Sequence, residues 1–516
     1  MSSSIAPDNL ANVLMSGAQA MRPEATAFID AKGVHTYGAL SGQIDRSATA
    51  FAALGLAPGD RILLCMLDSA ALVAAFLGAI KCGVVPVLLN TLFTASDYAY
   101  LLEDASPRAI LVSESLWPVW RDAIGCSGWT GEILRDGEAV EFGVQGFAPD
   151  LAAPLAPTST HPAQAEDIAF WLYSSGSTGR PKGVLHRHSS APATAELFAR
   201  QVLGLTQADV VYSAAKLFFA YGLGNALTFP LSVGAATVLY PDRATPEAVC
   251  RLLLEHKVTV FCGVPTLFAA LLASPHMPKR GFPALRLCTS AGEALPEALG
   301  LAWKQATGVD IIDGIGSTEM LHIYVSNRPG AVAYGTTGHP VPGYETRLMD
   351  EAGGPATADE MGELWVRGPS MTTGYWNQAA KTAETFVGGW MRTGDKFYRN
   401  PAGALVHCGR ADDMLKISGI WVSPAEVENA LLAHAAVLEA AVIGVPDADD
   451  LIKTKAFVVL KPGFSGDEAK RAELQAFVKG RLAPHKYPRI IAFVDDLPKT
   501  ATGKIRRHIL REREGA

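Results

Sequence analysis

Apolar and polar positions alternate with two different periods over the first part of this chain. Between about 25 and 300, short apolar runs typical of buried strands, such as RILLCM (61–66) and VTVFC (258–262), alternate with Ala- and Leu-rich runs at helical spacing, such as ALVAAFLGAI (71–80) and PEAVCRLLLEH (246–256). This alternation predicts an α/β architecture with largely buried strands.

The pattern changes between about 335 and 410, where glycines separate short strand-like runs such as GELWVRGP (362–369) and GALVHCGR (403–410). This region is therefore predicted to form a β-rich subdomain.

A new helix is predicted to begin at Ser423, with Pro424 at its first position and Glu426 closing a capping box. The pattern then predicts strands AAVIGV and TKAFVVL, a helix over DEAKRAELQAFVKGRL and a strand RIIAFVD. Together these form a small α+β module, so we place a domain boundary near Asp412.

The expected fold is thus α/β, with a large N-terminal domain (1–411) of α/β subdomains plus a β-rich subdomain. A small, mobile α+β C-terminal domain (412–516) completes it. The chain of 516 residues, 49% of them hydrophobic, is too long for one core, which agrees with this division.

Composition excludes several classes of partner. The net charge is −7 and no dense basic run precedes the last dozen residues, which argues against nucleic acid. The longest apolar stretch, 71–90, is interrupted by Lys81 and Pro86, so it is predicted to be buried and not to span a membrane.

The N-terminal sequence MSSSIAPDNL lacks the features of a secretion signal. The seven cysteines are odd in number and contain no C-x-x-C pair, so they are predicted to be reduced core residues. A cytoplasmic location is the expectation.

Chemistry concentrates first in the stretch YSSGSTGRPKG (173–183). Glycines allow backbone N–H groups to converge on an anion, hydroxyls add donors, and Lys182 adds a compact charge that suits phosphate. The spacing is neither that of a Walker loop nor that of a serine hydrolase elbow. A plain solvated Ser/Gly loop remains the alternative at this point.

Five further stretches stand in a definite order along the chain. They are TSAGEALP (289–296), DGIGSTEM (313–320), MRTGDKF (391–397), GRADDMLKISG (409–419) and PKTATGKIRR (498–507). With the first stretch, they resemble the adenylate-forming superfamily of acyl-CoA synthetases, luciferases and peptide-synthetase adenylation domains, over about 20 to 510.

The resemblance implies a reaction in two steps. A carboxylate attacks the α-phosphate of ATP to give an acyl-adenylate and pyrophosphate, and coenzyme A then displaces AMP. Lys504, Glu319 and Thr178 are implied to be catalytic, with Glu319 holding Mg²⁺ and Lys504 reaching the carboxylate and α-phosphate during adenylation. Asp395 and Arg410 are implied to bind the ribose.

The nucleotide site implied by the resemblance is larger than these residues. It comprises Ser174, Ser175, Gly176, Ser177, Thr178, Gly179, Lys182, Gly292, Glu293, Ala294, Asp313, Gly314, Ile315, Gly316, Ser317, Thr318, Asp395, Arg410 and Lys504. Many members carry a Tyr that stacks on adenine where Ile315 stands, so an aliphatic side chain would pack there in this chain.

The second step implies that the small domain rotates. Asp412 matches the hinge of the family, and the rotation would withdraw Lys504 and bring Lys416 and Gly419 to the thiol of coenzyme A.

The acid pocket is expected around KLFFAYGLGNA (216–226), which has no carboxylate to pair with an α-amino group. This stretch closely resembles the benzoate-CoA ligase branch of the family. The implied substrate-binding residues are Phe219, Ala220, Tyr221, Gly222, Ile315 and His322. Phe218 is better explained as core.

The expectation is therefore an aryl-CoA ligase that uses ATP, Mg²⁺ and coenzyme A, with an unspecified benzoate as substrate. An enzyme that loads an aryl acid onto a carrier protein, and a CoA ligase for another small acid, remain alternatives. A homodimer, and a lysine acyltransferase that silences Lys504, are further hypotheses about partners.

Overall fold

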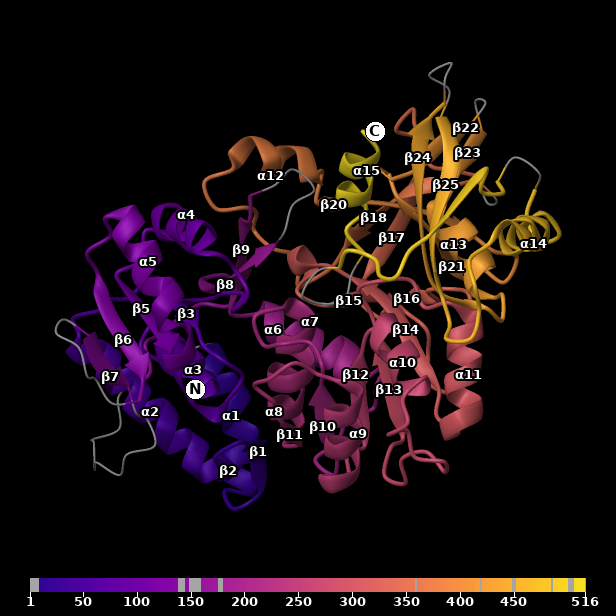
Figure 1. Cartoon of the computed structure of the whole chain (residues 1–516). Helices are drawn as coiled ribbons and strands as arrows, with labels where there is room; N and C mark the ends of the chain where they lie inside the picture. The colour runs from indigo at the N-terminus through magenta and orange to yellow at the C-terminus, as the bar shows by residue number, and fades with distance from the viewer. Residues whose placement is uncertain are drawn as a thin grey trace.

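The computed structural model describes residues 9–137, 144–147, 159–174, 180–357, 360–411, 413–417, 420–447, 452–483, 486–499 and 505–515; within these, the side chains of residues 18–21, 144, 416, 420 and 421 are not described. Two large sheets, a smaller β subdomain and a C-terminal module follow one another across the molecule (Figure 1).

The first sheet has seven strands in the order β7-β6-β5-β3-β4-β8-β9, all parallel except for the antiparallel pair β8–β9. The strands are β3 (Arg61–Cys65), β4 (Val85–Leu88), β5 (Ala109–Ser113), β6 (Glu132–Asp136), β7 (Val144–Phe147), β8 (Ile168–Ser174) and β9 (Lys182–Arg187). The helices α2 (Tyr37–Ala53), α3 (Ala70–Lys81), α4 (Ala95–Ala105) and α5 (Trp117–Ser127), with the 3₁₀ turn η1 (Glu114–Leu116), belong to the same segment of chain.

The second sheet has nine strands in the order β16-β15-β14-β13-β12-β10-β11-β1-β2. They are β1 (Thr26–Asp30), β2 (Gly33–Thr36), β10 (Val210–Ser213), β11 (Ala236–Val238), β12 (Val260–Gly263), β13 (Leu287–Ser290), β14 (Ile311–Gly316), β15 (Ile323–Ser326) and β16 (His339–Pro340). The N-terminal hairpin therefore crosses to this sheet, because β1 pairs with β11.

The helices of this second region are mostly short. They are α1 (Leu10–Met21), α6 (Ser190–Thr194), α7 (Ala220–Leu223), α8 (Phe229–Val233), α9 (Pro246–Glu255), α10 (Pro265–Leu272) and α11 (Glu297–Thr307), with two π-helical turns, η2 (Ala195–Arg200) and η3 (Gly224–Thr228), and a 3₁₀ turn η4 (Thr318–Met320). Since π-helical turns are rare and often lie at functional sites, η2 and η3 are candidates for positioning side chains of such a site.

The predicted β-rich subdomain is confirmed as a five-stranded sheet of β17 (Glu345–Met349), β18 (Gly362–Arg367), β19 (Phe386–Val387), β20 (Trp390–Arg399) and β21 (Leu405–Arg410), with the helix α12 (Ala379–Thr385) inserted before β19.

The C-terminal module lies at the upper right of Figure 1. It contains β22 (Leu415–Ile417), β23 (Ile420–Val422), α13 (Pro424–Leu432), β24 (Val437–Pro446), β25 (Ile452–Leu460), α14 (Glu468–Lys479), β26 (Ile490–Phe493) and α15 (Arg507–Glu514). The predicted large α/β domain followed by a small α+β domain is confirmed, whereas the boundary residue Asp412 lies outside the described residues.

Two details of the sequence prediction are corrected. Ser423 does cap α13, but the Glu426 carboxylate pairs with Lys486 Nζ at 2.7 Å and so does not close a capping box. The cysteines are all free thiols, yet Cys126 is exposed because it lies near the end of α5, and Cys82 is half-buried.

The long apolar stretch predicted to be buried forms α3 and β4, whose side chains are covered almost throughout. No helix among the described residues has the length and apolarity needed to cross a membrane.

Candidate functional site

The hairpin formed by β8 and β9 supports one side of the site, called here the phosphate side. Ser174 at the end of β8 pairs in register with Lys182 at the start of β9, and the loop between them, 175–179, lies outside the described residues. The hydroxyl of Ser174 lies 3.5 Å from Oε1 of Glu319. Two of the predicted stretches, far apart in sequence, therefore meet here.

Lys182 is half-buried, and its ammonium lies 4.5 Å from the centre of the Tyr375 ring. Burial lowers the pKa of Lys182, and the nearby Glu319 carboxylate opposes that shift. The Tyr375 hydroxyl donates to Glu319 Oε1 at 2.9 Å. A cation, a carboxylate and a phenol thus converge at one point.

The turn between β14 and β15 carries side chains for both sides of the site. Glu319 lies in η4 and His322 follows it, with Leu321 between them at φ 62°. A buried leucine in the left-handed region is strained, and such strain often marks functional sites. The chain turns at Leu321, so Glu319 and His322 belong to different sides of the site although both lie in the short segment 318–322.

His322 lies at the centre of the other side, called here the acid side. Its ring is 4.5 Å from Phe229, 5.1 Å from Phe198 and 5.5 Å from Tyr221, centre to centre. Phe198 lies within η2 and Phe229 follows η3, so the two π-helical turns bring these aromatic rings together.

The acid side carries no charge at His322, the residue at its centre. Neither ring nitrogen of His322 has a hydrogen-bond partner among the described residues, and burial lowers its pKa to about 3, so the ring is neutral. The Tyr221 hydroxyl lies 2.6 Å from Thr289 Oγ1, and Ile315 packs in the same core cluster as Tyr221.

Glycines near the acid side are required by close packing. A Cβ at Gly222 would lie 2.0 Å from the carbonyl oxygen of Lys216, so the neighbouring backbone leaves no room for a side chain at this position. A Cβ at Gly224 would lie 2.4 Å from the His322 ring. Ala220 is buried and Phe219 half-buried against the neighbouring Phe218, which is core as predicted.

The glycines of β14 have the same explanation. A Cβ at Gly314 would lie 2.8 Å from Ile323 and one at Gly316 would lie 2.6 Å from the His322 carbonyl oxygen, across the β14–β15 hairpin. Asp313 is buried, which raises the pKa of its carboxyl well above the usual value, and its Oδ1 has no hydrogen-bond donor among the described residues.

Asp395 and Arg410 face each other across β20 and β21. Arg410 Nη1 lies 3.5 Å from the Asp395 carboxylate and donates to the Thr393 carbonyl at 2.9 Å. His407 Nε2 lies 3.4 Å from the other Asp395 oxygen. Asp395, at 9% exposure, is therefore held in place by two neighbours from the paired strand.

The loop after β13 meets the C-terminal module. Gly292 adopts φ 94° and is exposed, while Glu293 and Ala294 are half-buried. The Glu293 carboxylate accepts the backbone N–H of Ile505 at 3.1 Å, which places the segment beginning at Ile505 beside this loop. The two domains therefore contact each other close to the predicted nucleotide residues.

Comparison with protein families and structures decides the identity of this arrangement. The model of the AMP-binding enzyme family matches residues 16–376, and that of the AMP-binding enzyme C-terminal domain matches residues 426–504. The chain belongs to the AMP-binding enzyme family.

Two curated members of this family are similar over most of their length. The benzoate–CoA ligase of Thauera aromatica is 55% identical, covering 94% of this chain and 92% of that protein. The 4-hydroxybenzoate–CoA/benzoate–CoA ligase of Rhodopseudomonas palustris is 48% identical, covering 94% and 90%.

A solved structure agrees with the fold. The benzoate CoA ligase from Burkholderia xenovorans superposes with a TM-score of 0.91 at 51% identity, covering 98% of this chain and 99% of that one.

Several of the predicted functional residues lie outside the described residues. They are 175–179 (Ser175, Gly176, Ser177, Thr178, Gly179), the hinge Asp412, Gly419 and Lys504. The backbone of Lys416 lies in the β22–β23 hairpin, but its side chain is not described. The roles assigned to these residues stay predictions.

Three contacts of the described site were not predicted from the sequence. They are the Tyr375 hydroxyl on Glu319, the close packing of Gly224 on His322 and the side-chain bond from Glu293 to the small domain. Tyr375 stands in the stretch GYWN (374–377), but nothing in its spacing indicated Glu319 as a neighbour.

Proposed function

We propose that this protein is an ATP-dependent aryl-CoA ligase that converts benzoate, or a close ring-substituted benzoate, to its coenzyme A thioester. The observation that carries this proposal is the neutral, buried His322 among three aromatic rings, one turn of chain from Glu319. A flat, uncharged ring matches such surroundings. Its carboxylate would then lie toward the phosphate side.

The nucleotide would lie between the loop at Gly292 and the strands β14 and β20. Asp313 Oδ1 is buried and has no hydrogen-bond donor among the described residues, whereas buried acceptors in proteins are nearly always paired. The amino group of adenine is a suitable donor. Asp395, oriented by Arg410 and His407, would accept the ribose hydroxyls.

The phosphate side fits a triphosphate with its metal. The phosphates would be surrounded by the loop 175–179 together with Ser174, Lys182, Ser317 and Thr318. The hydroxyl of Thr178 would donate a hydrogen bond during the reaction. No cluster of three or more His, Cys, Asp or Glu side chains suited to a metal occurs in the described part of the chain. A single carboxylate, Glu319, agrees with Mg²⁺ held mainly by phosphate oxygens. The ion would offset charge on the phosphates during adenylation.

The reaction proceeds in two displacements. A carboxylate oxygen of the acid attacks the α-phosphorus, the bond from that phosphorus to the α,β-bridging oxygen breaks, and pyrophosphate leaves. Lys504 would stabilise the negative charge that develops at the α-phosphate. The coenzyme A thiol, losing its proton, then attacks the acyl carbon, and AMP leaves.

The orientation of the small domain is consistent with the first step. Ile505, next to Lys504 in sequence, donates to Glu293 beside the nucleotide loop. We assign this arrangement to the adenylating state. Rotation about Asp412, with the boundary at 411/412, would bring Lys416 and Gly419 to the thiol in the second step.

The test is a panel of carboxylic acids assayed for AMP release with and without coenzyme A. The proposal predicts that benzoate or a substituted benzoate has the highest kcat/KM and that coenzyme A is consumed. Equal kcat/KM for benzoate and hexanoate would contradict it. Adenylate formation without thioester would favour loading of a carrier protein instead.

The remaining hypotheses are independent of this assay. A homodimer would be tested by the mass in solution, and acylation of Lys504 by mass spectrometry after treatment with a lysine acyltransferase. Acylation would remove the charge of Lys504 and stop adenylation. A cytoplasmic location would be tested by cell fractionation.

A further inference from the structure

The segment 372–376 covers the edge of the first sheet beside β9. Val184 forms an isolated antiparallel bridge with Tyr375. Leu185 N–H donates to the Gly374 carbonyl at 3.3 Å, and Trp376 N–H donates to the Gly183 carbonyl at 2.8 Å. The backbone of Tyr375 is therefore fixed to the strand that begins with Lys182.

The same segment also holds the turn that carries Glu319. Thr372 N–H donates to the backbone carbonyl of Glu319 at 2.8 Å, while Tyr375 donates its hydroxyl to the Glu319 carboxylate at 2.9 Å. Thr372 and Tyr375, three positions apart, thus hydrogen-bond to the main chain and the side chain of Glu319. Ser174 approaches the same carboxylate oxygen at the longer distance of 3.5 Å.

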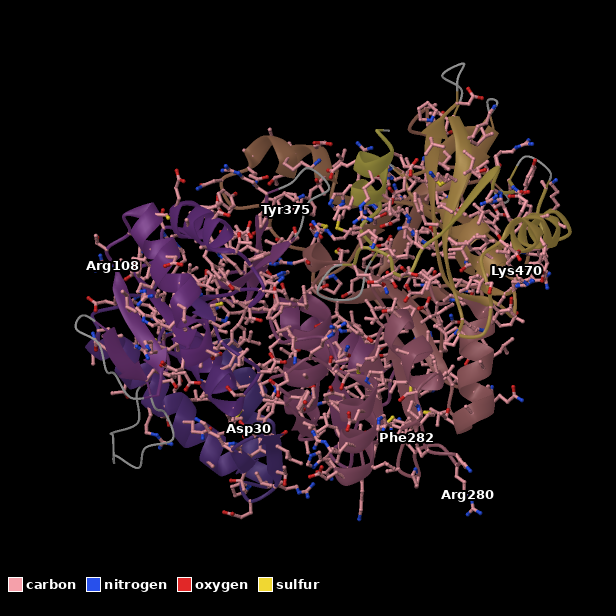
Figure 2. All side chains as sticks on the ribbon, in the orientation of Figure 1. Asp30, Arg108, Arg280, Phe282, Tyr375 and Lys470 are labelled. Carbon is pink, nitrogen blue, oxygen red and sulfur yellow. The ribbon has the colours of Figure 1, made fainter. Side chains whose placement is uncertain are left out.

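The ring of Tyr375 has a second contact that does not depend on its hydroxyl. The Lys182 ammonium lies 4.5 Å from the ring centre, within the range of a cation–π interaction. Phe386 packs against the ring at 5.7 Å, and only 7% of Tyr375 is exposed. Figure 2 labels Tyr375 beside β9 and below α12, between the two large regions of the molecule.

An ionised carboxylate can only accept hydrogen bonds, so the Tyr375 hydroxyl is the donor of its pair with Glu319. A carboxylate that ligates a metal is oriented by such hydrogen bonds, and their loss typically weakens metal binding. The ring and the hydroxyl thus act on two different groups of the phosphate side.

We propose that Tyr375 is a positioning residue that orients the carboxylate of Glu319 through its hydroxyl and the ammonium of Lys182 through its ring. The inference rests on the proposed function, in which Glu319 meets the metal and Lys182 meets the phosphates. It predicts that the two contacts can be removed separately.

The experiment compares two variants of the full chain. Tyr375→Phe removes the hydroxyl but keeps the ring, so Mn²⁺ binding in the presence of a non-hydrolysable ATP analogue should weaken by roughly 10- to 100-fold. The affinity for the metal-free analogue should not change. Tyr375→Leu removes both contacts, so both affinities should fall. Mn²⁺ is followed by electron paramagnetic resonance, independently of turnover.

Tyr37→Phe is the matched control, because Tyr37 is also buried and its hydroxyl donates to the Ala235 carbonyl at 2.8 Å, a contact that involves no residue of the phosphate side. It should bind Mn²⁺ and the analogue as the parent does. Thermal unfolding of each variant identifies any variant that fails to fold. If Tyr375→Leu fails to fold, Mn²⁺ binding by Tyr375→Phe alone decides whether the hydroxyl positions Glu319.

Two results separate this inference from the proposed function. If Tyr375→Phe binds Mn²⁺ like the parent while Glu319→Gln does not, Tyr375 does not position Glu319 and the inference is overturned. If Glu319→Gln itself binds Mn²⁺ like the parent, the metal role in the proposed function is wrong instead.

Discussion

The phosphate side and the acid side are neighbours along the chain but differ in how they are built. On the phosphate side, polar groups from several segments bond to one another, as Ser174, Tyr375 and Glu319 do. On the acid side, His322 lies among aromatic rings with no partner for its nitrogens in the described structure. Charge placement therefore governs the first, and shape governs the second.

This difference predicts different responses to mutation. Loss of a charge on the phosphate side should slow adenylation of every acid by a similar factor. A change of volume on the acid side should alter the choice between acids and spare the chemistry of ATP. The two sides can therefore be told apart by comparing two acids, or the two half-reactions, in variants of Lys504, Gly224 and Glu293.

The largest effect is expected from Lys504→Ala. Removing one donor to developing oxyanion charge costs about 2.7 to 4 kcal/mol, so benzoyl-adenylate formation should fall roughly 100- to 1,000-fold. Benzoyl-CoA formation from supplied benzoyl-adenylate should continue near the parental rate. Single-turnover measurement of each half-reaction checks both statements.

Lys499→Ala is the control for that variant, because Lys499 is close in sequence but bonds to Glu439 and Asp496 within the small domain. It should adenylate benzoate at near the parental rate. If Lys504→Ala slowed both half-reactions equally, Lys504 would be structural and the domain rotation would have no support.

A smaller effect is expected from Gly224→Ala on the acid side. The new Cβ would press on the His322 ring, and overpacking of this kind costs about 1 to 3 kcal/mol, or roughly 5- to 150-fold in kcat/KM for benzoate. The KM for ATP should not change. Steady-state kinetics with benzoate and with a smaller acid measures the shift in preference.

Gly78→Ala provides a control for overpacking alone. Its Cβ would lie 2.5 Å from Ser47, where α3 packs against α2. We expect a lower stability for this variant but the parental preference among acids. If Gly224→Ala lowered kcat/KM by the same factor for benzoate and for the smaller acid, the shape of the acid side would not govern the choice of substrate.

Glu293→Ala tests the contact between the domains and should have a modest effect. Loss of the hydrogen bond to Ile505 removes about 1 kcal/mol, so adenylation should slow about fivefold while thioester formation is unchanged. Glu297→Ala, an exposed acid in the first turn of α11, is the control. A slower thioester step in Glu293→Ala would assign the contact to the other orientation.

The smallest effect is expected from pH on the acid side. Because burial lowers the pKa of His322 to about 3, the ring stays neutral and the KM for benzoate should not follow its titration between pH 6 and 8.5. A change in KM near pH 6.5 that disappears in His322→Gln would contradict the buried, neutral ring.

Stability should nevertheless respond to acid. His322 and His186 both have pKa values lowered to about 3 by burial, so the unfolded chain binds their protons below about pH 6.5 and the folded chain does not. Stability should therefore fall as the pH drops from 6.5 toward 3, by up to about 1.4 kcal/mol per pH unit for each histidine. Urea unfolding of the parent and of His186→Phe at several pH values measures the two contributions.

The sequence alone determined the architecture and the family of the site. Apolar runs with the periods of strand and helix predicted β3, α3, β12 and α9 to within two residues at each end, because burial of one face depends on local spacing. The order of the motifs around Lys182, Glu319 and Asp395 indicated their common chemistry, since each motif is a short contiguous stretch that is recognisable from the sequence alone.

Only the tertiary structure decided which groups act on one another. The contact of Tyr375 with Glu319 and Lys182 joins segments more than fifty positions apart, and the bond from Glu293 to Ile505 joins two domains. The left-handed Leu321, which separates the two sides of the site, is disfavoured by its own side chain. Such contacts depend on packing between distant elements, which no local period encodes.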